Sequence, residues 1–321
     1  MPTTFLITGA AGFIGSHLTE RLLGEGHAVV GMDNFNDFYD PARKRRNLQR
    51  VAEHEGFTLI EGDIRDRQAV FDAFTAYQPQ VVVHLAAMAG VRPSIENPQL
   101  YTQVNLDGTV NLLDAAVAYQ TERFIFASSS SVYGNNQKVP FAEEDRVDFP
   151  ISPYAATKKA GELLCHTYTH VHDLPIFCLR FFTVFGPRQR PDLAIHKFLR
   201  LLRCGKPIPM FGDGSTSRDY TYIDDILAGI RAAIDRCGLE HRYRVYNLGG
   251  SHPVTLRELI GAIERVTGLV AKIDQQPMQP GDVNRTWADL ARSQAELGYE
   301  PAISLEEGLA RQWAWMQEQE G

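Results

Sequence analysis

Tyr154 and Lys158 form the pair of side chains best suited to chemistry in this sequence of 321 residues. They are four residues apart in a segment that opens with Ser152 and Pro153, which is typical of a helix start. The spacing therefore predicts that both side chains lie on one face of the helix. An ammonium group beside a phenol lowers the phenol pKa from about 10. We therefore expect Tyr154 to take a proton from an alcohol.

Four consecutive serines supply hydroxyl groups near the same point. They extend from Ser128 to Ser131 and follow the apolar run 124–127, which is typical of a buried strand. Their hydroxyls would gather at the carboxyl end of a sheet strand, where open α/β folds bind ligands. A flexible serine-rich loop is the simpler alternative, but the apolar run before the serines favours a site.

Three glycines predict a dinucleotide-binding turn. Gly9, Gly12 and Gly15 lie between a predicted strand and a predicted helix. The first allows a tight turn, the second lets a pyrophosphate approach the backbone, and the third lets helix and strand pack closely. The start of the helix offers N–H groups and a partial positive charge to the phosphates.

Asp33 indicates which dinucleotide binds. It ends the predicted second strand, where a carboxylate can accept hydrogen bonds from both hydroxyls of the adenine ribose. The same carboxylate would repel a 2′-phosphate, and no arginine follows it directly. The sequence therefore favours NAD over NADP as the cofactor.

Short apolar runs alternate with helix-period segments through the first half of the chain, which predicts βα units on a parallel sheet. The predicted strands are residues 5–8, 28–33, 57–63, 81–87, 124–129, 176–182 and 244–250, and the longest predicted helices are 100–119 and 154–171. The fold class is therefore α/β, a Rossmann-type doubly wound parallel sheet with a smaller α/β substrate-binding domain.

The chain divides where this pattern changes. Beyond about residue 185, loops rich in proline and glycine mix with short helices. We predict that residues 1–185 form the NAD-binding domain, joined by a returning segment at about 217–250. Residues 186–216 and 251–321 then form the second domain, and the length of the chain fits this division.

The composition excludes several classes of protein. With 44% apolar and 22% charged residues, the chain is neither disordered nor a disulfide-stapled miniprotein. Its formal net charge of −7 argues against a nucleic-acid-binding surface. No apolar run approaches the length of a membrane span, and no secretory signal pattern opens the chain. We expect a cytoplasmic protein with neither nucleic-acid nor membrane partners.

A metal is not expected either. The four cysteines match no paired metal or redox spacing. His166 and His170 lie four residues apart on a predicted helix, but no carboxylate or cysteine has the spacing of a third ligand.

The chain resembles the extended short-chain dehydrogenase/reductase family over essentially its full length, through the spacing G-x-x-G-x-x-G, Asp33 and the set Ser129, Tyr154 and Lys158. In that family Tyr154 would be the base, Lys158 would bind the nicotinamide ribose and tune Tyr154, and Ser129 would hydrogen-bond the reacting hydroxyl. The resemblance implies an NAD site made by Gly9, Gly12, Phe13, Ile14, Gly15, Asp33, Asn34, Asp63, Ile64, Leu85, Ala86, Ala87, Asn105, Ser128, Tyr154 and Lys158. The family usually dimerises through helices that correspond to 100–118 and 154–171, so we expect a homodimer.

Within that family the chain is most similar to nucleotide-sugar 4-epimerases. The similarity lies in residues 128–134, 181–183, 186–188, 218–220 and 280–282. It implies a redox-neutral reaction, in which C4 of a UDP-sugar is oxidised to a 4-keto group and reduced again from the opposite face, with NAD regenerated in each cycle. It implies that Arg218, Asp282 and the region of Phe211 bind the UDP part.

Further features resemble UDP-glucuronate 4-epimerases, which interconvert UDP-glucuronate and UDP-galacturonate. They are the segments 35–39, 190–194 and 278–283, and Thr183 stands where glucose-type 4-epimerases usually have Asn. A C6 carboxylate requires a cation and hydroxyl donors, which Arg190 with Thr183, Ser130 and Ser131 could supply. The implied substrate site contains Ser129, Ser130, Ser131, Tyr154, Thr183, Arg188, Arg190, Phe211, Arg218 and Asp282. The alternative interpretation of Arg190 is a solvated loop charge.

Competing activities of the family require other residues. A 4,6-dehydratase carries an Asp-Glu pair where this chain has Ser130 and Ser131, and UDP-glucuronate decarboxylases usually carry Glu at the position of Ser131. The resemblance therefore favours epimerisation. The open alternatives are a UDP-glucose or UDP-N-acetylglucosamine 4-epimerase, and a catalytically silent NAD-sensing or scaffold protein. Silent members commonly lose at least one catalytic residue, which this chain has not done.

Overall fold

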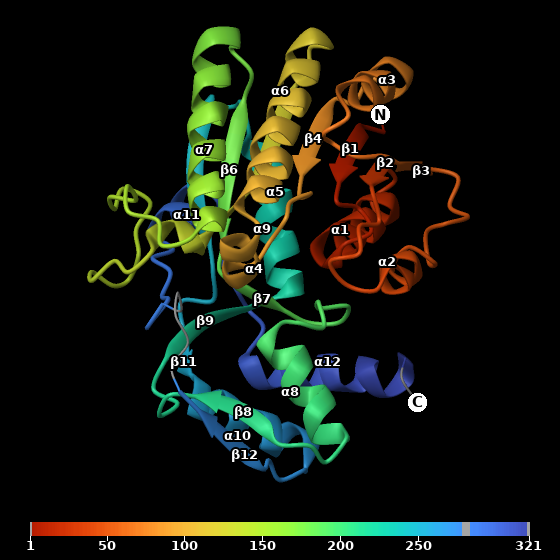
Figure 1. The fold of residues 1–321 in the computed structure, drawn as a ribbon. Coiled ribbons are helices and arrows are strands. Elements are labelled where there is room, and N and C mark those ends of the chain that lie inside the picture. Colours follow the sequence, from red (N-terminus) through yellow and green to blue (C-terminus); the bar gives the residue numbers. More distant parts are fainter. Residues whose placement is uncertain (1, 278–282, 320–321) are drawn as a thin grey trace.

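A seven-stranded sheet forms the centre of the larger part of the molecule (Figure 1). A computed structural model describes residues 2–277 and 283–319. All neighbouring strands of the sheet are parallel, in the order β10-β6-β5-β4-β1-β2-β3. The strands are β1 (Thr4–Thr8), β2 (Ala28–Asp33), β3 (Phe57–Glu61), β4 (Val81–His84), β5 (Arg123–Ser129), β6 (Ile176–Phe181) and β10 (Tyr243–Leu248).

All seven predicted strands are present, and the predicted α/β doubly wound fold is confirmed. The largest errors lie at the carboxyl ends, because β4 ends at His84 and not at residue 87, and β3 ends at Glu61 and not at residue 63. Leu85 to Ala87 and Asp63 instead leave the sheet and line the cavity described below.

Helices cover both faces of this sheet. Phe5 and Ile7 of β1 belong to the core cluster on one face, and Leu6 belongs to the cluster on the other. Successive side chains of a strand point to opposite faces of the sheet. Because helices cover both faces here, both sets of side chains are apolar and the strands are continuous apolar runs. The face around Phe5 packs against α1 (Phe13–Gly24) and α9 (Ile223–Arg236). The opposite face packs against α3 (Arg67–Tyr77), α6 (Gly108–Ala118) and α7 (Pro153–His172).

The predicted helix at 154–171 is confirmed as α7. Ser152 is its N-cap and accepts a hydrogen bond from the Ala155 backbone N–H at 3.1 Å, and Pro153 fills the first helical position. Gly161 lets the helix approach β5 closely, because a Cβ at this position would collide with the ring of Phe126.

The predicted helix at 100–119 is confirmed, but one of its turns is irregular. Residues 98–118 form α5 (Pro98–Thr102), a π-helical turn (Gln103–Asp107) and α6. The wide turn carries Asn105, whose side chain accepts from the Met88 N–H at 2.8 Å and donates to the Met88 carbonyl at 3.0 Å. These bonds tie the helix to the loop after β4, as is common for π turns near functional sites.

Two small sheets and several helices lie below the large sheet in Figure 1. One sheet has the order β11-β9-β7 and the other pairs β12 with β8. Their strands are β7 (Thr183–Phe185), β8 (Ile208–Phe211), β9 (Ser217–Tyr222), β11 (Pro253–Thr255) and β12 (Ile273–Gln276). The remaining helices are α2 (Pro41–Asn47), α4 (Val91–Glu96), the 3₁₀ turn Ser130–Tyr133, α8 (Ala194–Arg203), α10 (Leu256–Thr267), α11 (Ala291–Leu297) and α12 (Leu305–Gln319). Within the described residues, no helix is long and apolar enough to cross a membrane.

The domain boundaries stay a prediction. In the returning segment 217–250, β10 joins the large sheet beside β6, whereas β9 pairs with β7 and β11 in a small sheet.

A buried ion pair ties α7 to the large sheet. Glu162 accepts from Arg180 Nε and Nη2 on β6, at 2.8 Å each, and from Ser128 Oγ at 2.6 Å. Both charged side chains are almost fully buried. Burial raises the pKa of Glu162, but the hydrogen bonds and charge of Arg180 outweigh it and hold the pKa below its usual value.

We predict that Glu162→Gln destabilises the fold by about 3 kcal/mol, because it leaves the buried guanidinium of Arg180 without its counter-charge. The midpoint of urea denaturation measures the loss. Glu61→Gln is the matched control, since Glu61 also forms a two-bond pair with Arg45, at 2.7 and 3.0 Å, but on an exposed surface. We expect its midpoint to stay near that of the wild type. Equal shifts in the two variants would show that burial of the pair contributes nothing.

Candidate active site

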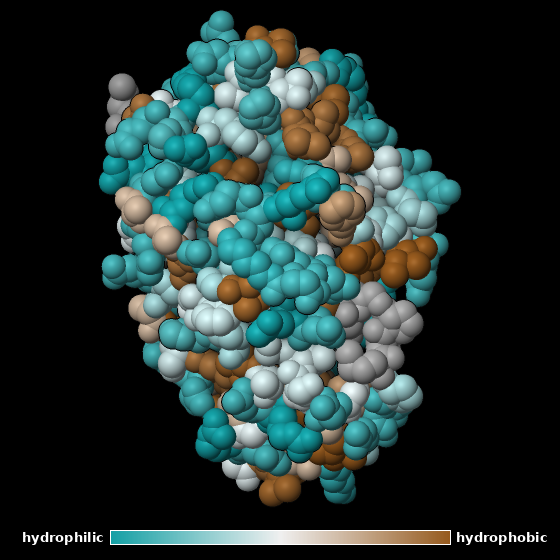
Figure 2. Space-filling view, turned by 90° about the vertical axis from the view of Figure 1, so that its left-hand side faces the viewer, coloured by the Kyte–Doolittle hydropathy of each residue, from teal (hydrophilic) through white to brown (hydrophobic). Residues whose placement is uncertain are grey.

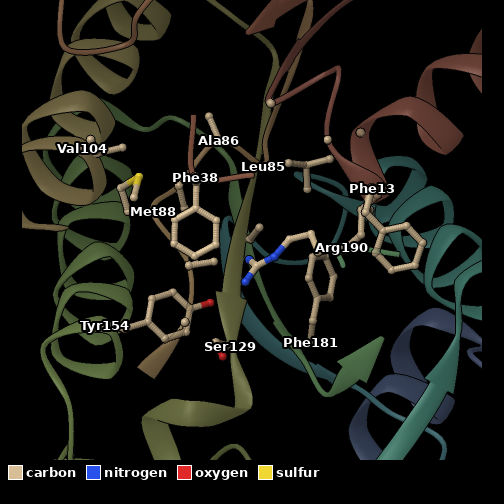
Figure 3. A pocket seen from close by; sticks show the side chains of 18 of the residues that line it. Phe13, Phe38, Leu85, Ala86, Met88, Val104, Ser129, Tyr154, Phe181 and Arg190 are labelled. Carbon is tan, nitrogen blue, oxygen red and sulfur yellow. The ribbon is translucent and has the colours of Figure 1, made fainter. Parts of the chain in front are cut away.

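One cavity of about 460 Å³ opens at the carboxyl ends of the large sheet, and most predicted site residues line it (Figure 3). The predicted residues that share this lining are Gly9, Gly12, Phe13, Ile14, Gly15, Asp33, Asn34, Asp63, Ile64, Leu85, Ala86, Ala87, Ser128, Ser129, Ser130, Ser131, Tyr154, Lys158, Thr183 and Arg190. They come from segments far apart in the chain, which the parallel sheet brings to one edge.

The glycine turn has the shape that a dinucleotide pyrophosphate requires. Gly9 has a φ of +72°, and its N–H donates to the Met32 carbonyl at 2.8 Å. A Cβ at Gly15 would collide with the Gly9 carbonyl oxygen. Helix α1 begins at Phe13 with no side-chain cap and no acidic residue in its first turn. Its positive end therefore faces the cavity without a competing carboxylate, which fits a bound phosphate.

Asp33 lies at the end of β2 and is buried. Its carboxylate accepts hydrogen bonds from the Ala11 N–H at 3.1 Å and the Phe35 N–H at 2.9 Å. Burial raises its pKa, although these two bonds and the charge of Lys44 oppose the shift. The carboxylate thus has a fixed orientation at the cavity wall, as recognition of ribose hydroxyls requires.

Asn34 and Asp63 form a second polar group beside it. Asn34 Nδ2 donates to Asp63 Oδ2 at 2.9 Å, and Arg65 donates to both oxygens of Asp63 at 3.0 and 2.7 Å. The hydrogen bond from Arg65 is the main reason that the pKa of Asp63 falls to about 2. This carboxylate therefore stays ionised.

The catalytic candidates Ser129, Tyr154 and Lys158 meet at the end of β5. The sequence predicts that Lys158 lowers the pKa of Tyr154, whereas in the structure burial dominates and the net shift of that pKa is upward. Lys158 Nζ donates to the Ala127 carbonyl at 2.7 Å, and burial lowers the pKa of its ammonium to about 8. Burial raises the pKa of Tyr154, and a hydrogen bond with Ser129 and the charge of Arg190 oppose this rise.

Arg190 lies on the other side of the cavity, and its guanidinium reaches toward the hydroxyl of Tyr154 (Figure 3). Its Cζ lies 4.9 Å from the centre of the Phe38 ring. Its side chain is only 17% exposed, so it is not a solvated loop charge. Ser130, Ser131 and Thr183 contribute hydroxyls to the same lining.

The structure does not bring every predicted residue into this lining. Arg188 donates to Glu20 at 2.5 Å and to Ser16 Oγ at 3.3 Å, both on α1. The residue has a φ of +64°, so the chain reverses locally and the side chains at 188 and 190 reach different surroundings. Asn105 instead orients the loop at Met88 and donates to Thr157 Oγ1 at 3.0 Å.

Two of the predicted UDP-binding residues, Phe211 and Arg218, are not part of the cavity lining. Phe211 lies under the guanidinium of Arg92, with 5.4 Å between Arg92 Cζ and the ring centre. Arg218 Nη1 donates to the Ser217 carbonyl at 2.9 Å. Asp282 lies outside the described residues.

Several lining residues were not predicted from the sequence. They are mostly apolar and come from loops, a strand end and helical turns: Phe38, Tyr39, Met88, Val91, Val104, Phe181, Phe182 and Leu193. Phe181 and Phe182, at the end of β6, carry a usable signal, because the carboxyl edge of a parallel sheet is the usual ligand edge.

A metal centre has no support in the described part of the chain. No group of three or more His, Cys, Asp or Glu side chains there could hold a metal ion. The rings of His166 and His170 stack in parallel with their centres 6.5 Å apart.

The comparisons with known proteins first define the class. The family model described as GDP-mannose 4,6 dehydratase matches residues 6–312. The chain belongs to this family of extended short-chain dehydrogenases/reductases, as the resemblance predicted.

Individual relatives are more specific. A UDP-glucuronate 4-epimerase of Thermodesulfobacterium geofontis is 44% identical over 315 residues, which cover 98% of this chain and 96% of that protein. The crystal structure of UDP-glucuronic acid 4-epimerase from Bacillus cereus, in complex with UDP-glucuronic acid and NAD, is similar with a TM-score of 0.92 at 37% identity, and covers 98% of this chain and 99% of that chain. The UDP-glucose 4-epimerase of Thermotoga maritima, with UDP-glucose, reaches a TM-score of 0.91 at 30% identity and covers 99% of this chain and 100% of that chain.

We predict that Lys158 carries a measurable stability penalty that depends on pH. Its pKa in the folded protein is about 8, below the 10.5 of an unperturbed lysine. Between these pH values the unfolded chain binds more protons than the folded protein, so folding stability rises with pH. Methionine in the Lys158→Met variant is neutral at every pH. Relative to this variant, the free energy of unfolding of the wild type should rise by about 3 kcal/mol between pH 8 and 10.5. Urea denaturation of both proteins across this range measures the difference, and a flat difference would contradict the lowered pKa.

Proposed function

We propose that the protein is an NAD-dependent isomerase that interconverts UDP-glucuronate and UDP-galacturonate at C4. The observation that carries the proposal is one cavity that combines Tyr154, Lys158 and Ser129 with the buried cation Arg190. The relatives named as UDP-glucuronate 4-epimerases support the same choice of substrate.

The residues present fit NAD. The Gly9–Gly15 turn would hold the pyrophosphate, Asp33 the adenine ribose, and Lys158 the nicotinamide ribose. When bound, NAD supplies the oxidation at C4 and the return of the same hydrogen to the opposite face of the sugar.

Tyr154 would take the proton of the sugar 4-hydroxyl and give it back after the keto sugar has turned over. It can do so only as a phenolate, so its own proton must first pass to solvent, and burial opposes this loss because it raises the pKa of Tyr154. Ser129 lies within hydrogen-bonding reach and would share the substrate hydroxyl. Lys158 remains charged below about pH 8 and would stabilise the phenolate once it forms.

Arg190, with Thr183, Ser130 and Ser131, would bind the C6 carboxylate. A 4-ketouronate is a β-keto acid and loses CO₂ when its carboxylate turns perpendicular to the carbonyl plane. A fixed cation therefore has two tasks, which are to bind the substrate and to prevent decarboxylation. Neither Ser130 nor Ser131 is acidic, which argues against a dehydratase or a decarboxylase.

The uridine diphosphate would lie toward the smaller sheets, with Arg218, Phe211 and Asp282 as its proposed contacts. We assign Arg188 a different task, because its bonds to Glu20 and Ser16 on α1 hold the loop that carries Arg190. In this division residues 1–185, with the returning segment 217–250, bind NAD. Residues 186–216 and 251–321 grip the nucleotide sugar.

We further propose a cytoplasmic homodimer. The four cysteines are free, which suits a reducing compartment.

Leu163 and Val171 on α7 are 57% and 63% exposed, and α6 packs beside α7. Figure 2 shows apolar patches among polar ones on the side that lies on the left in Figure 1, where α7 is found. A pairing of these two helices with those of a second copy would cover both side chains.

Incubation with UDP-glucuronate, UDP-glucose or UDP-N-acetylglucosamine, without added NAD, tests the function. We expect chromatography to show UDP-galacturonate from the first and little product from the other two. Turnover of UDP-glucose would support the alternative for which the Thermotoga maritima neighbour is the precedent. No product from any of the three would reject the epimerase and favour a silent NAD-binding protein.

We predict that Arg190→Ala loses at least 100-fold in kcat/KM for UDP-glucuronate, because a buried charged hydrogen-bond partner of about 3 kcal/mol is removed. Some UDP-pentose from decarboxylation should accompany the remaining product. Arg146→Ala is the control, since Arg146 pairs with Asp148 on an exposed surface. Unchanged kinetics in Arg190→Ala would remove the carboxylate-binding role.

A further inference from the structure

Arg190 is held from behind by a carboxylate two residues along the chain. Its Nε donates to Asp192 Oδ1 at 3.0 Å, and its Nη2 donates to Asp192 Oδ2 at 2.6 Å. Asp192 is 45% exposed and is not among the residues that line the cavity, whereas Arg190 is. The pair therefore spans the cavity wall, with the anion outside and the cation inside.

A guanidinium has two edges that can each bind a carboxylate through two parallel hydrogen bonds. One edge is formed by Nε and Nη2, and the other by Nη1 and Nη2. Asp192 occupies the first edge, so the second edge remains for a ligand. Figure 3 shows the end of the Arg190 side chain directed into the cavity toward Tyr154.

We propose that Asp192 is a positioning residue that turns the free edge of Arg190 toward the sugar carboxylate and fixes the plane in which that carboxylate is bound. The proposal rests on the proposed function. The ring of Phe38 lies against the guanidinium, 4.9 Å from Arg190 Cζ, and limits its tilt. Asp192 fixes the edge of the guanidinium that faces the cavity, and Phe38 limits its tilt. Together they would hold the guanidinium in one orientation.

This positioning should cost substrate affinity. The carboxylate of the substrate approaches a cation that Asp192 already half neutralises, and the two carboxylates repel each other. Removal of the Asp192 charge should therefore tighten binding of UDP-glucuronate while it loosens the orientation. A merely structural residue would not produce this combination, because damage to the site weakens binding.

The side reaction reports the orientation directly. In the 4-ketouronate the bond between C5 and C6 breaks, CO₂ leaves, and the electron pair forms an enolate over C5, C4 and the keto oxygen. The enolate then takes a proton at C5 and yields a 4-ketopentose. The bond can break only when it lies perpendicular to the carbonyl plane, so a carboxylate that rotates freely decarboxylates more often.

The test measures the ratio of decarboxylated to epimerised product from UDP-glucuronate in a double-mutant cycle. Its members are the wild type, Asp192→Asn, Arg190→Lys and the double variant. We expect Asp192→Asn to raise the ratio about tenfold and to lower KM about threefold, with inhibition by UDP unchanged because UDP has no carboxylate. The ammonium group of lysine is a point charge and has no planar edge for Asp192 to orient. In the Arg190→Lys background, Asp192→Asn should therefore not change the product ratio further.

Asp148→Asn is the matched control. Arg146 and Asp148 form an exposed pair with the same spacing, and Arg146 Nε donates to Asp148 Oδ2 at 2.7 Å. A ratio within twofold of the wild type in Asp192→Asn would overturn the proposal. An equal increase in both backgrounds would also overturn it, since Asp192 would then act independently of Arg190. A wild type that does not epimerise UDP-glucuronate would reject the proposed function instead.

Discussion

The close packing of α7 against β5 is the contact on which the rest of the site depends. Gly161 removes the side chain that would otherwise collide with Phe126. Lys158 and Glu162, on successive turns of the helix, then reach the Ala127 carbonyl and the Ser128 hydroxyl at the end of the strand. Because Tyr154 lies one turn earlier on the same face, its distance from Ser129 is set by core packing and not by a loop.

Charge is the second constraint. The chain carries a formal charge of −7, yet its proposed ligands are anions. The structure concentrates positive charge inside the cavity, where Arg190, Lys158 and Lys44 contribute to the lining. Burial makes these cations stronger partners for an anion than the same charges on the surface would be. The two acids of the lining, Asp33 and Asp63, lie on the predicted adenosine side.

The strands and the cofactor turn could be predicted because their causes are local. β1 and β2 must be apolar on both sides, and Gly9 and Gly15 stand where no side chain fits. The π turn at Asn105 could not be predicted, because the side chain that it positions bonds to Met88, 17 residues earlier in the chain. Arg188 and Arg190 look equivalent in the sequence, and only the turn between them separates one from the cavity.

The central claim is that this cavity moves one hydrogen from one face of C4 to the other without exchange with water. The most direct measurement follows UDP-glucuronate that carries deuterium at C4, incubated in ordinary water without added NAD. We predict UDP-galacturonate that retains the deuterium at C4, seen by mass spectrometry and NMR. Product in which solvent hydrogen has replaced the label at C4 would contradict the account.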